Sequence, residues 1–197
     1  MLPWLEKLGE KIPLWDFRVP GVTSITADIH KYGFCCKGAS VVVYRTKELR
    51  SHQFFAYSEW PGGLFGSPSM AGSRPGGLIA AAWAALSHMG QDGYMEIAAL
   101  ILLTTKKLLR GVKEIDGIRT MVSPNMTALA IEADDPTVSI LAVADAMERH
   151  GWKMERQQLP DSLHMSVLPQ HAASSSDLLN DLAASVAEVC KLLFLPL

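Results

Sequence analysis

The sequence predicts an α/β protein, because short β-branched runs alternate with longer apolar segments of helical character. Val22–Ala27 and Ser40–Tyr44 are the clearest strand candidates, and the second run is typical of a strand buried on both faces. Leu78–Met89 and about Gln91–Leu109 predict two helices. With 197 residues and 49% hydrophobic content, the chain is long enough to bury a core.

The two predicted helices differ in their expected surroundings. Leu78–Met89 is Ala-rich and apolar nearly all round, so we expect it to be buried or to lie at a subunit interface. The second helix has Lys106-Lys107 and Arg110-Gly111 at its end, the cations and glycine expected at a helix C-terminus. A turn over Gly111–Gly117 should follow.

After the turn, the predicted elements are four strands and two helices. Strands are expected over 118–121, 127–133, 152–158 and 164–168, with a helix capped by Asp135-Pro136 to about His150 and a last helix capped by Ser174–Asp177 to about Leu193. This part reads as a small separate α/β domain. The predicted domains are therefore residues 1–110 and residues 111–197.

A long loop is expected between Pro61 and Gly77, after an extended aromatic stretch over Phe54–Trp60. Its density of Gly and Pro is incompatible with a helix or a central strand. Loops of this length in compact domains tend to be functional, so we interpret it as a binding loop.

Charge and cysteine content exclude several classes of function. A formal charge of -2 with no clustered basic stripe argues against nucleic-acid binding. Cys35, Cys36 and Cys190 lack metal-ligand spacing and cannot form a disulfide framework, so we expect no metal and a reducing compartment. The printed sequence has no signal-peptide pattern and no apolar run near the roughly 20 residues that span a bilayer. It reads as cytosolic.

The candidate functional stretch is Thr23–Gly33, centred on His30-Lys31. A lysine becomes a nucleophile toward carbonyls when desolvation or neighbouring cationic charge deprotonates its amine. Most lysines are solvated surface residues, so Lys31 by itself is weak support for catalysis.

Three separated motifs, however, agree in order and spacing with one enzyme family. Asp28-Ile-His-Lys31 is similar to the Schiff-base segment of the group II pyridoxal-phosphate decarboxylases. Asp16–Val22, Lys37–Arg45 and Trp60–Gly77 narrow the resemblance to the sphingosine-1-phosphate lyases. The likeness runs from about Leu2 to Tyr94 and then thins through the small domain.

The resemblance implies the C-terminal half of a fold-type-I enzyme, with an incomplete large domain, a small domain and pyridoxal 5'-phosphate as cofactor. Lys31 would bind the cofactor as a Schiff base, and His30 would lie near its phosphate. The Gly72-Ser73-Arg74 loop would contribute to the phosphate region of the partner subunit in a homodimer. The reaction implied is retro-aldol cleavage of a phosphorylated long-chain base to a fatty aldehyde and phosphoethanolamine.

The resemblance also implies parts that the printed sequence lacks. Family members begin with a membrane anchor, which places them at the cytosolic face of the endoplasmic reticulum, and continue with the first half of the large domain. We therefore expect this chain to be inactive alone. Ile29 stands where a small polar residue is usual, and Cys35-Cys36 replace an aromatic or Ala-Pro pair.

Two alternatives stay open. A group II amino-acid decarboxylase shares the Asp-x-His-Lys pattern, although the Trp60–Gly77 loop argues against it. The other alternative is a non-catalytic fragment that pairs with a full-length subunit, since an incomplete domain leaves an exposed edge.

A redox or soft-metal role for Cys35 and Cys36 is the less favoured interpretation of that pair.

Overall fold

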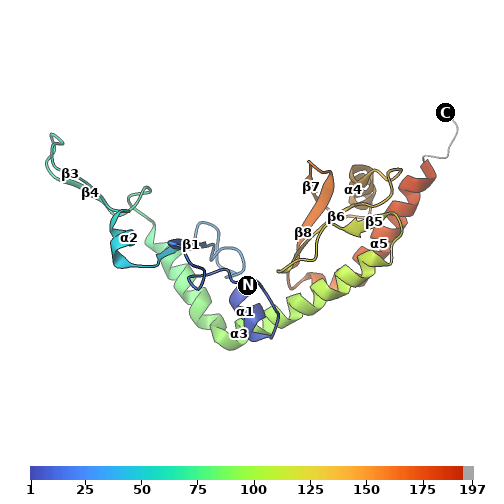
Figure 1. Ribbon diagram of the computed structural model, residues 1–197, viewed down its shortest axis with the longest axis horizontal. Helices are drawn as coiled ribbons and strands as arrows, with labels where there is room; N and C mark the ends of the chain where they lie inside the picture. The colour runs from blue at the N-terminus through green and yellow to red at the C-terminus, as the bar shows by residue number, and fades with distance from the viewer. Residues whose placement is uncertain (193–197) are drawn as a thin grey trace. The chain divides into compact units, whose positions relative to one another are not determined.

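The computed structural model describes residues 1–192, and its α/β class agrees with the prediction (Figure 1). The chain divides into two compact units. One comprises Pro13–Asp92, and the other comprises Met1–Ile12 together with the chain from Gly93 onward. This division by packing falls inside the long helix described below. The proposed domains, residues 1–110 and 111–197, stay a prediction.

The unit that carries Lys31 begins with an antiparallel pair of strands. β1 (Ser24–Ala27) pairs with β2 (Val41–Tyr44), with Ser24 opposite Tyr44 and Ala27 opposite Val41. The expected order of strand, lysine loop and strand is therefore confirmed. The expected burial of β2 on both faces is wrong within the described residues, because Val41, Val42 and Val43 are 45%, 42% and 48% exposed.

A short helix and a hairpin follow in the same unit. α2 (Lys47–Ser51) begins after Thr46, whose hydroxyl accepts a hydrogen bond from Leu49 N. β3 (Phe55–Tyr57) pairs with β4 (Phe65–Ser67), so the predicted loop over 61–77 contains a strand. The prolines of this stretch lie outside the three-residue ladder, which is why their density does not prevent pairing.

One continuous assignment, α3 (Gly76–Lys113), covers both predicted helices. The helical backbone is interrupted at Gly90, with φ of 55° and ψ of -171°, between the two predicted ranges. Before Gly90 the apolar face of α3 is exposed to solvent, and Trp83 is 71% exposed. The expected burial of the helix Leu78–Met89 is therefore wrong within the described residues. An interface role for that face stays a prediction.

Beyond Gly90, the second half of α3 is buried in the other unit and does not end where its sequence suggests. Ala98, Ile101 and Leu108 are almost fully buried. Gly111 lies inside the helix, and a Cβ added there would lie 2.4 Å from Leu179 Cδ1 of the last helix. The glycine allows close packing of two helices, and the positive φ expected of a terminating glycine occurs at Gly117.

The larger unit contains a four-stranded antiparallel sheet in the order β5-β6-β8-β7 (Figure 1). The strands confirm the predicted positions to within a few residues, and the unit's helices are α1, the second half of α3, α4 and α5. The fully buried side chains that form its core include Ile131, Val143, Met147, Leu163 and Leu182. The bounds are α1 Leu2–Lys7, β5 Ile118–Thr120, β6 Ala128–Ala133, α4 Ile140–Arg149, β7 Glu155–Gln157, β8 Ser162–Ser166 and α5 His171–Leu192.

Both predicted caps in this unit are wrong. α4 begins after Ser139, whose hydroxyl accepts from Ala142 N, whereas Asp135 accepts from the amide and hydroxyl of Thr137 in a local turn. α5 already begins at His171, which places Ser174–Ser176 inside it. The expected end at Leu193 lies outside the described residues.

Candidate functional site

Lys31 lies in a tight turn of the loop that joins β1 to β2. Its amide donates to Asp28 O at 3.0 Å, its carbonyl accepts from Phe34 N at 3.0 Å, and Phe34 has a φ of 54°. The turn presents the lysine outward, and the side chain is 66% exposed. The predicted loop position of Lys31 is confirmed.

Asp28 holds the amine of Lys31. Asp28 Oδ2 lies 2.8 Å from Lys31 Nζ, and Oδ1 accepts from Ser40 Oγ at 2.8 Å. The hydrogen bonds from Lys31 and Ser40, in that order, lower the pKa of the Asp28 carboxyl below its usual value. The carboxylate is therefore ionised at neutral pH and forms an ion pair with the amine.

His30 closes the base of the loop. Its amide donates to Ala39 O at 3.1 Å and its Nδ1 lies 2.8 Å from the same oxygen. A carbonyl only accepts, so Nδ1 carries a proton and Nε2 is the acceptor in the neutral ring. In this structure the imidazole therefore fixes the distance between the two ends of the lysine loop.

The second predicted segment, Gly72-Ser73-Arg74, forms a turn before α3. Gly72 has a φ of 62° and donates its amide to Ser69 O at 3.2 Å, and Arg74 Nη1 donates to Ser69 Oγ. The side chains of Ser73 and Arg74 are exposed. The positive φ explains the need for glycine at position 72.

A cavity of about 150 Å³ connects this turn with the lysine loop. Arg74 and the first turn of α3 line it from one side, and Ile29 and Ser40 line it from the other. Within residues 1–192, no recorded hydrogen bond or ion pair joins Lys31 to Gly72, Ser73 or Arg74. The structure thus brings the two segments to one cavity, and within residues 1–192 no hydrogen bond or ion pair joins their predicted site residues.

Sequence reasoning named Asp28 only as part of the Asp-x-His-Lys motif and gave neither Asp28 nor Ser40 a role in the site. The three-residue spacing from Asp28 to Lys31 was a usable signal, since one turn brings such side chains together. Ser40 lies twelve positions from Asp28, and only the pairing of β1 with β2 brings it close.

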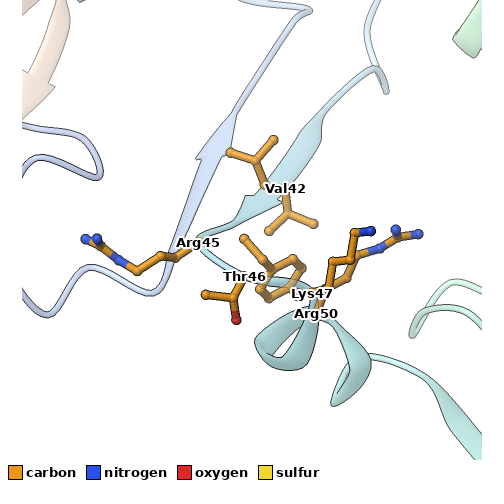
Figure 2. A pocket seen from close by; sticks show the side chains of 7 residues that line it. Val42, Arg45, Thr46, Lys47 and Arg50 are labelled. Carbon is orange, nitrogen blue, oxygen red and sulfur yellow. The ribbon is translucent and has the colours of Figure 1, made fainter.

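A larger open cavity of about 410 Å³ lies at the end of β2 and the start of α2. Figure 2 shows Arg45 directed away from Lys47 and Arg50. Arg45 donates to the carbonyls of Val22, Phe17 and Val19 at 2.6, 2.8 and 2.9 Å, and Arg50 lies over the Phe54 ring. Both arginines therefore serve local structure.

The residues present suit pyridoxal phosphate in their chemistry. An exposed lysine amine can combine with an aldehyde, and Gly, Ser and Arg are good donors to a phosphate. In the part of the chain described, no cluster of three or more His, Cys, Asp or Glu side chains is arranged to hold a metal ion. None of the helices within residues 1–192 combines the length and apolar character needed to cross a bilayer.

Two curated relatives from one enzyme family match nearly the whole of this chain. The chain is 48% identical over 189 residues to the sphingosine-1-phosphate lyase of Oryza sativa subsp. japonica, a match that covers 96% of this chain and 35% of the relative. It is 42% identical over 186 residues to the lyase of Dictyostelium discoideum, covering 94% and 34%. The chain thus spans about a third of the length of these curated relatives. No protein-family model matches it.

Solved structures with a similar fold include a lyase of the same kind. The sphingosine-1-phosphate lyase of Burkholderia pseudomallei matches with a TM-score of 0.91 and 41% identity, over 97% of this chain and 43% of that one. A glutamate decarboxylase from Lactobacillus brevis matches with a TM-score of 0.74 at 20% identity, over 90% and 43%. The second likeness shows a shared fold only.

Proposed function

Because the chain is homologous to the sphingosine-1-phosphate lyases over nearly its whole length, we propose that it is the lysine-bearing part of a pyridoxal-phosphate-dependent carbon–carbon lyase. The substrate would be a phosphorylated sphingoid base, cleaved between C2 and C3 to a fatty aldehyde and phosphoethanolamine. The observation that carries the proposal is the turn that exposes Lys31 beside Asp28.

Each residue of the proposed site has a distinct task. When bound, the cofactor supplies the electron sink for breaking the carbon–carbon bond. Lys31 would hold the cofactor through its amine, and Asp28 orients that amine. His30 keeps the loop closed on Ala39, while Gly72, Ser73 and Arg74 bind a phosphate with backbone and side-chain donors.

We also propose an oligomeric state and a location. The chain works within a homodimer at the cytosolic face of the endoplasmic reticulum, with the remaining part of the lyase present. The amino-acid decarboxylase alternative has weaker support, because the decarboxylase likeness extends to the fold alone.

Trapping with borohydride tests the role of Lys31. The purified chain is incubated with pyridoxal phosphate, reduced, digested and mapped by mass spectrometry. We expect the adduct chiefly on Lys31, its loss in Lys31→Arg, and its retention in Lys37→Arg, which alters another exposed lysine of the same loop. Equal labelling of all exposed lysines would contradict the proposal.

A second candidate function is pairing with a lyase chain. It is favoured by the apolar side chains that the smaller unit exposes on three elements: Val41, Val42 and Val43 on β2, Phe55 and Phe65 on the hairpin, and Ile79 and Trp83 on α3. Large exposed apolar patches mark surfaces that bind other protein. In this reading the chain is a non-catalytic partner of a full-length subunit.

Co-expression with the full-length Oryza sativa lyase distinguishes the two. A non-catalytic partner would co-purify with the lyase and change its activity equally as wild type and as Lys31→Arg. A catalytic contribution would instead be lost in Lys31→Arg.

A further inference from the structure

Cys35 and Cys36 form a thiol pair at the end of the turn that begins at Lys31. Their sulfur atoms lie 3.8 Å apart in a thiol–thiol hydrogen bond. Cys35 is half-buried and Cys36 is exposed. Burial, and then the hydrogen bond with Cys36, raise the pKa of the Cys35 thiol. Cys36 is the more accessible partner for a reagent in solution.

The pair is connected to Lys31 by the hydrogen bonds of the turn. Cys35 N donates to Ile29 O at 3.2 Å, and Phe34 N donates to Lys31 O at 3.0 Å. Phe34, between them, has the positive φ that a phenylalanine adopts only under constraint. A backbone change at Cys35 and Cys36 therefore alters the same turn that presents the Lys31 amine.

We propose that Cys35 and Cys36 form a reversible disulfide with each other, and that its formation loosens the turn and releases Lys31 from Asp28. The oxidant is a low-molecular-weight disulfide such as oxidised glutathione. The Cys36 thiolate attacks one sulfur of that disulfide and expels one glutathione thiolate. Cys35 then attacks the Cys36 sulfur and expels the second, and the two cysteine protons end on the two glutathiones.

Geometry makes this disulfide easily reduced. Neighbouring Cα atoms across a trans peptide lie about 3.8 Å apart, whereas disulfides usually join Cα atoms about 4.4–6.8 Å apart. Closure must distort the Cys35–Cys36 backbone, and the Cys35 N to Ile29 O bond lies directly beside that distortion. The disulfide would therefore form under oxidising conditions and reopen when thiol is restored.

Mass spectrometry of the whole chain tests disulfide formation without any cofactor. The chain is equilibrated with mixtures of reduced and oxidised glutathione, blocked with an alkylating reagent and digested. We expect wild type and Cys190→Ser to lose the mass of two hydrogens within the Cys35–Cys36 peptide, reversibly with dithiothreitol. Cys35→Ser should stop at a mixed disulfide on Cys36. A lasting glutathione adduct on wild-type Cys36, or a disulfide to Cys190, would overturn the proposal.

Acetylation of lysines tests the consequence for the turn. In the oxidised chain we expect the acetylation rate of Lys31 to rise several-fold, while exposed Lys47 serves as the internal reference. Cys36→Ser should show no difference between the two glutathione mixtures. An unchanged Lys31 rate in a chain that has formed the disulfide would refute the coupling. Any effect on cofactor capture rests on the proposed function, but neither measurement requires that function.

Discussion

Asp28 determines how the proposed catalytic amine is held. Its two carboxylate oxygens divide between Lys31 Nζ and Ser40 Oγ, each at 2.8 Å, so the serine orients the carboxylate and the carboxylate orients the lysine. The arrangement is partly open to solvent, with Asp28 34% exposed. Ion pairs of this kind add little stability, so its effect should be on Lys31 reactivity.

Replacing Asp28 should therefore change chemistry more than folding. In Asp28→Asn, the negative partner of the Lys31 ammonium is lost, and we expect acetylation of Lys31 to be several-fold faster at neutral pH. Ser40→Ala should give a smaller increase, because only the orientation of the carboxylate is affected. Asp16→Asn breaks another exposed ion pair, with Arg18, and should leave Lys31 unchanged. Equal Lys31 rates in Asp28→Asn and wild type would exclude the positioning role.

His171 makes the stability of the larger unit depend on pH. Its Nδ1 accepts from Leu168 N at 3.0 Å at the start of α5, and burial lowers its pKa below the usual 6.5. A lowered folded-state pKa means that this stability is present above pH 6.5 and is lost as the pH falls through the folded-state value.

Thermal unfolding measured at pH values above and below 6.5 tests the direction of this pH dependence. The melting temperature of wild type should fall on acidification, and His171→Ala should show a flatter dependence with a lower value at neutral pH. His88→Ala, which removes an exposed histidine, should follow wild type. A dependence that is unchanged in His171→Ala would assign the effect to other groups.

At the scale of the elements, two glycines with similar sequence signals have different effects. Gly90 falls between the two predicted helix ranges, and Gly111 was predicted to follow the end of the second helix. Gly90 interrupts α3, whereas Gly111 lies within it against Leu179. Local sequence cannot distinguish the cases, because the contact with α5 comes from residues 68 positions away.

The role of Gly111 can be tested by a double-mutant cycle. Gly111→Ala should lower the free energy of unfolding, since the added Cβ would lie 2.4 Å and 2.6 Å from the two Leu179 methyl carbons. In a Leu179→Ala background the same change should be stabilising, by up to about 1 kcal/mol from helix propensity. Denaturant titration of the four chains measures both values. The same sign in both backgrounds would contradict close packing as the reason for the glycine.

At the scale of the whole molecule, the two units differ in how completely they are packed. The unit with the four-stranded sheet has a core of fully buried side chains, including Ile131 and Leu163. The unit with Lys31 exposes the apolar residues of β2 and of the first half of α3. The β-branched run at Ser40–Tyr44 correctly predicted a strand, but its burial depends on protein that would cover it.

The difference between local patterns and long-range contacts explains how much of the site could be predicted from the sequence. The strands and helices of the larger unit, and the loop position of Lys31, follow from local patterns and from the motifs of the resemblance. The contacts of Asp28 with Ser40 and of His30 with Ala39 depend on strand pairing across the loop. The roles of Gly72, Ser73 and Arg74 stay predictions, because they concern a phosphate and, in the proposal, a second subunit.

A chimera tests the proposed lyase function most directly. The matching segment of the Oryza sativa lyase is replaced by this chain, and cleavage of a phosphorylated sphingoid base is measured. Asp16→Asn within the inserted segment serves as a matched control for substitution itself. We predict that the chimera releases fatty aldehyde and that Lys31→Arg abolishes release, whereas a folded, cofactor-loaded chimera without cleavage, or full activity in Lys31→Arg, would contradict the proposal.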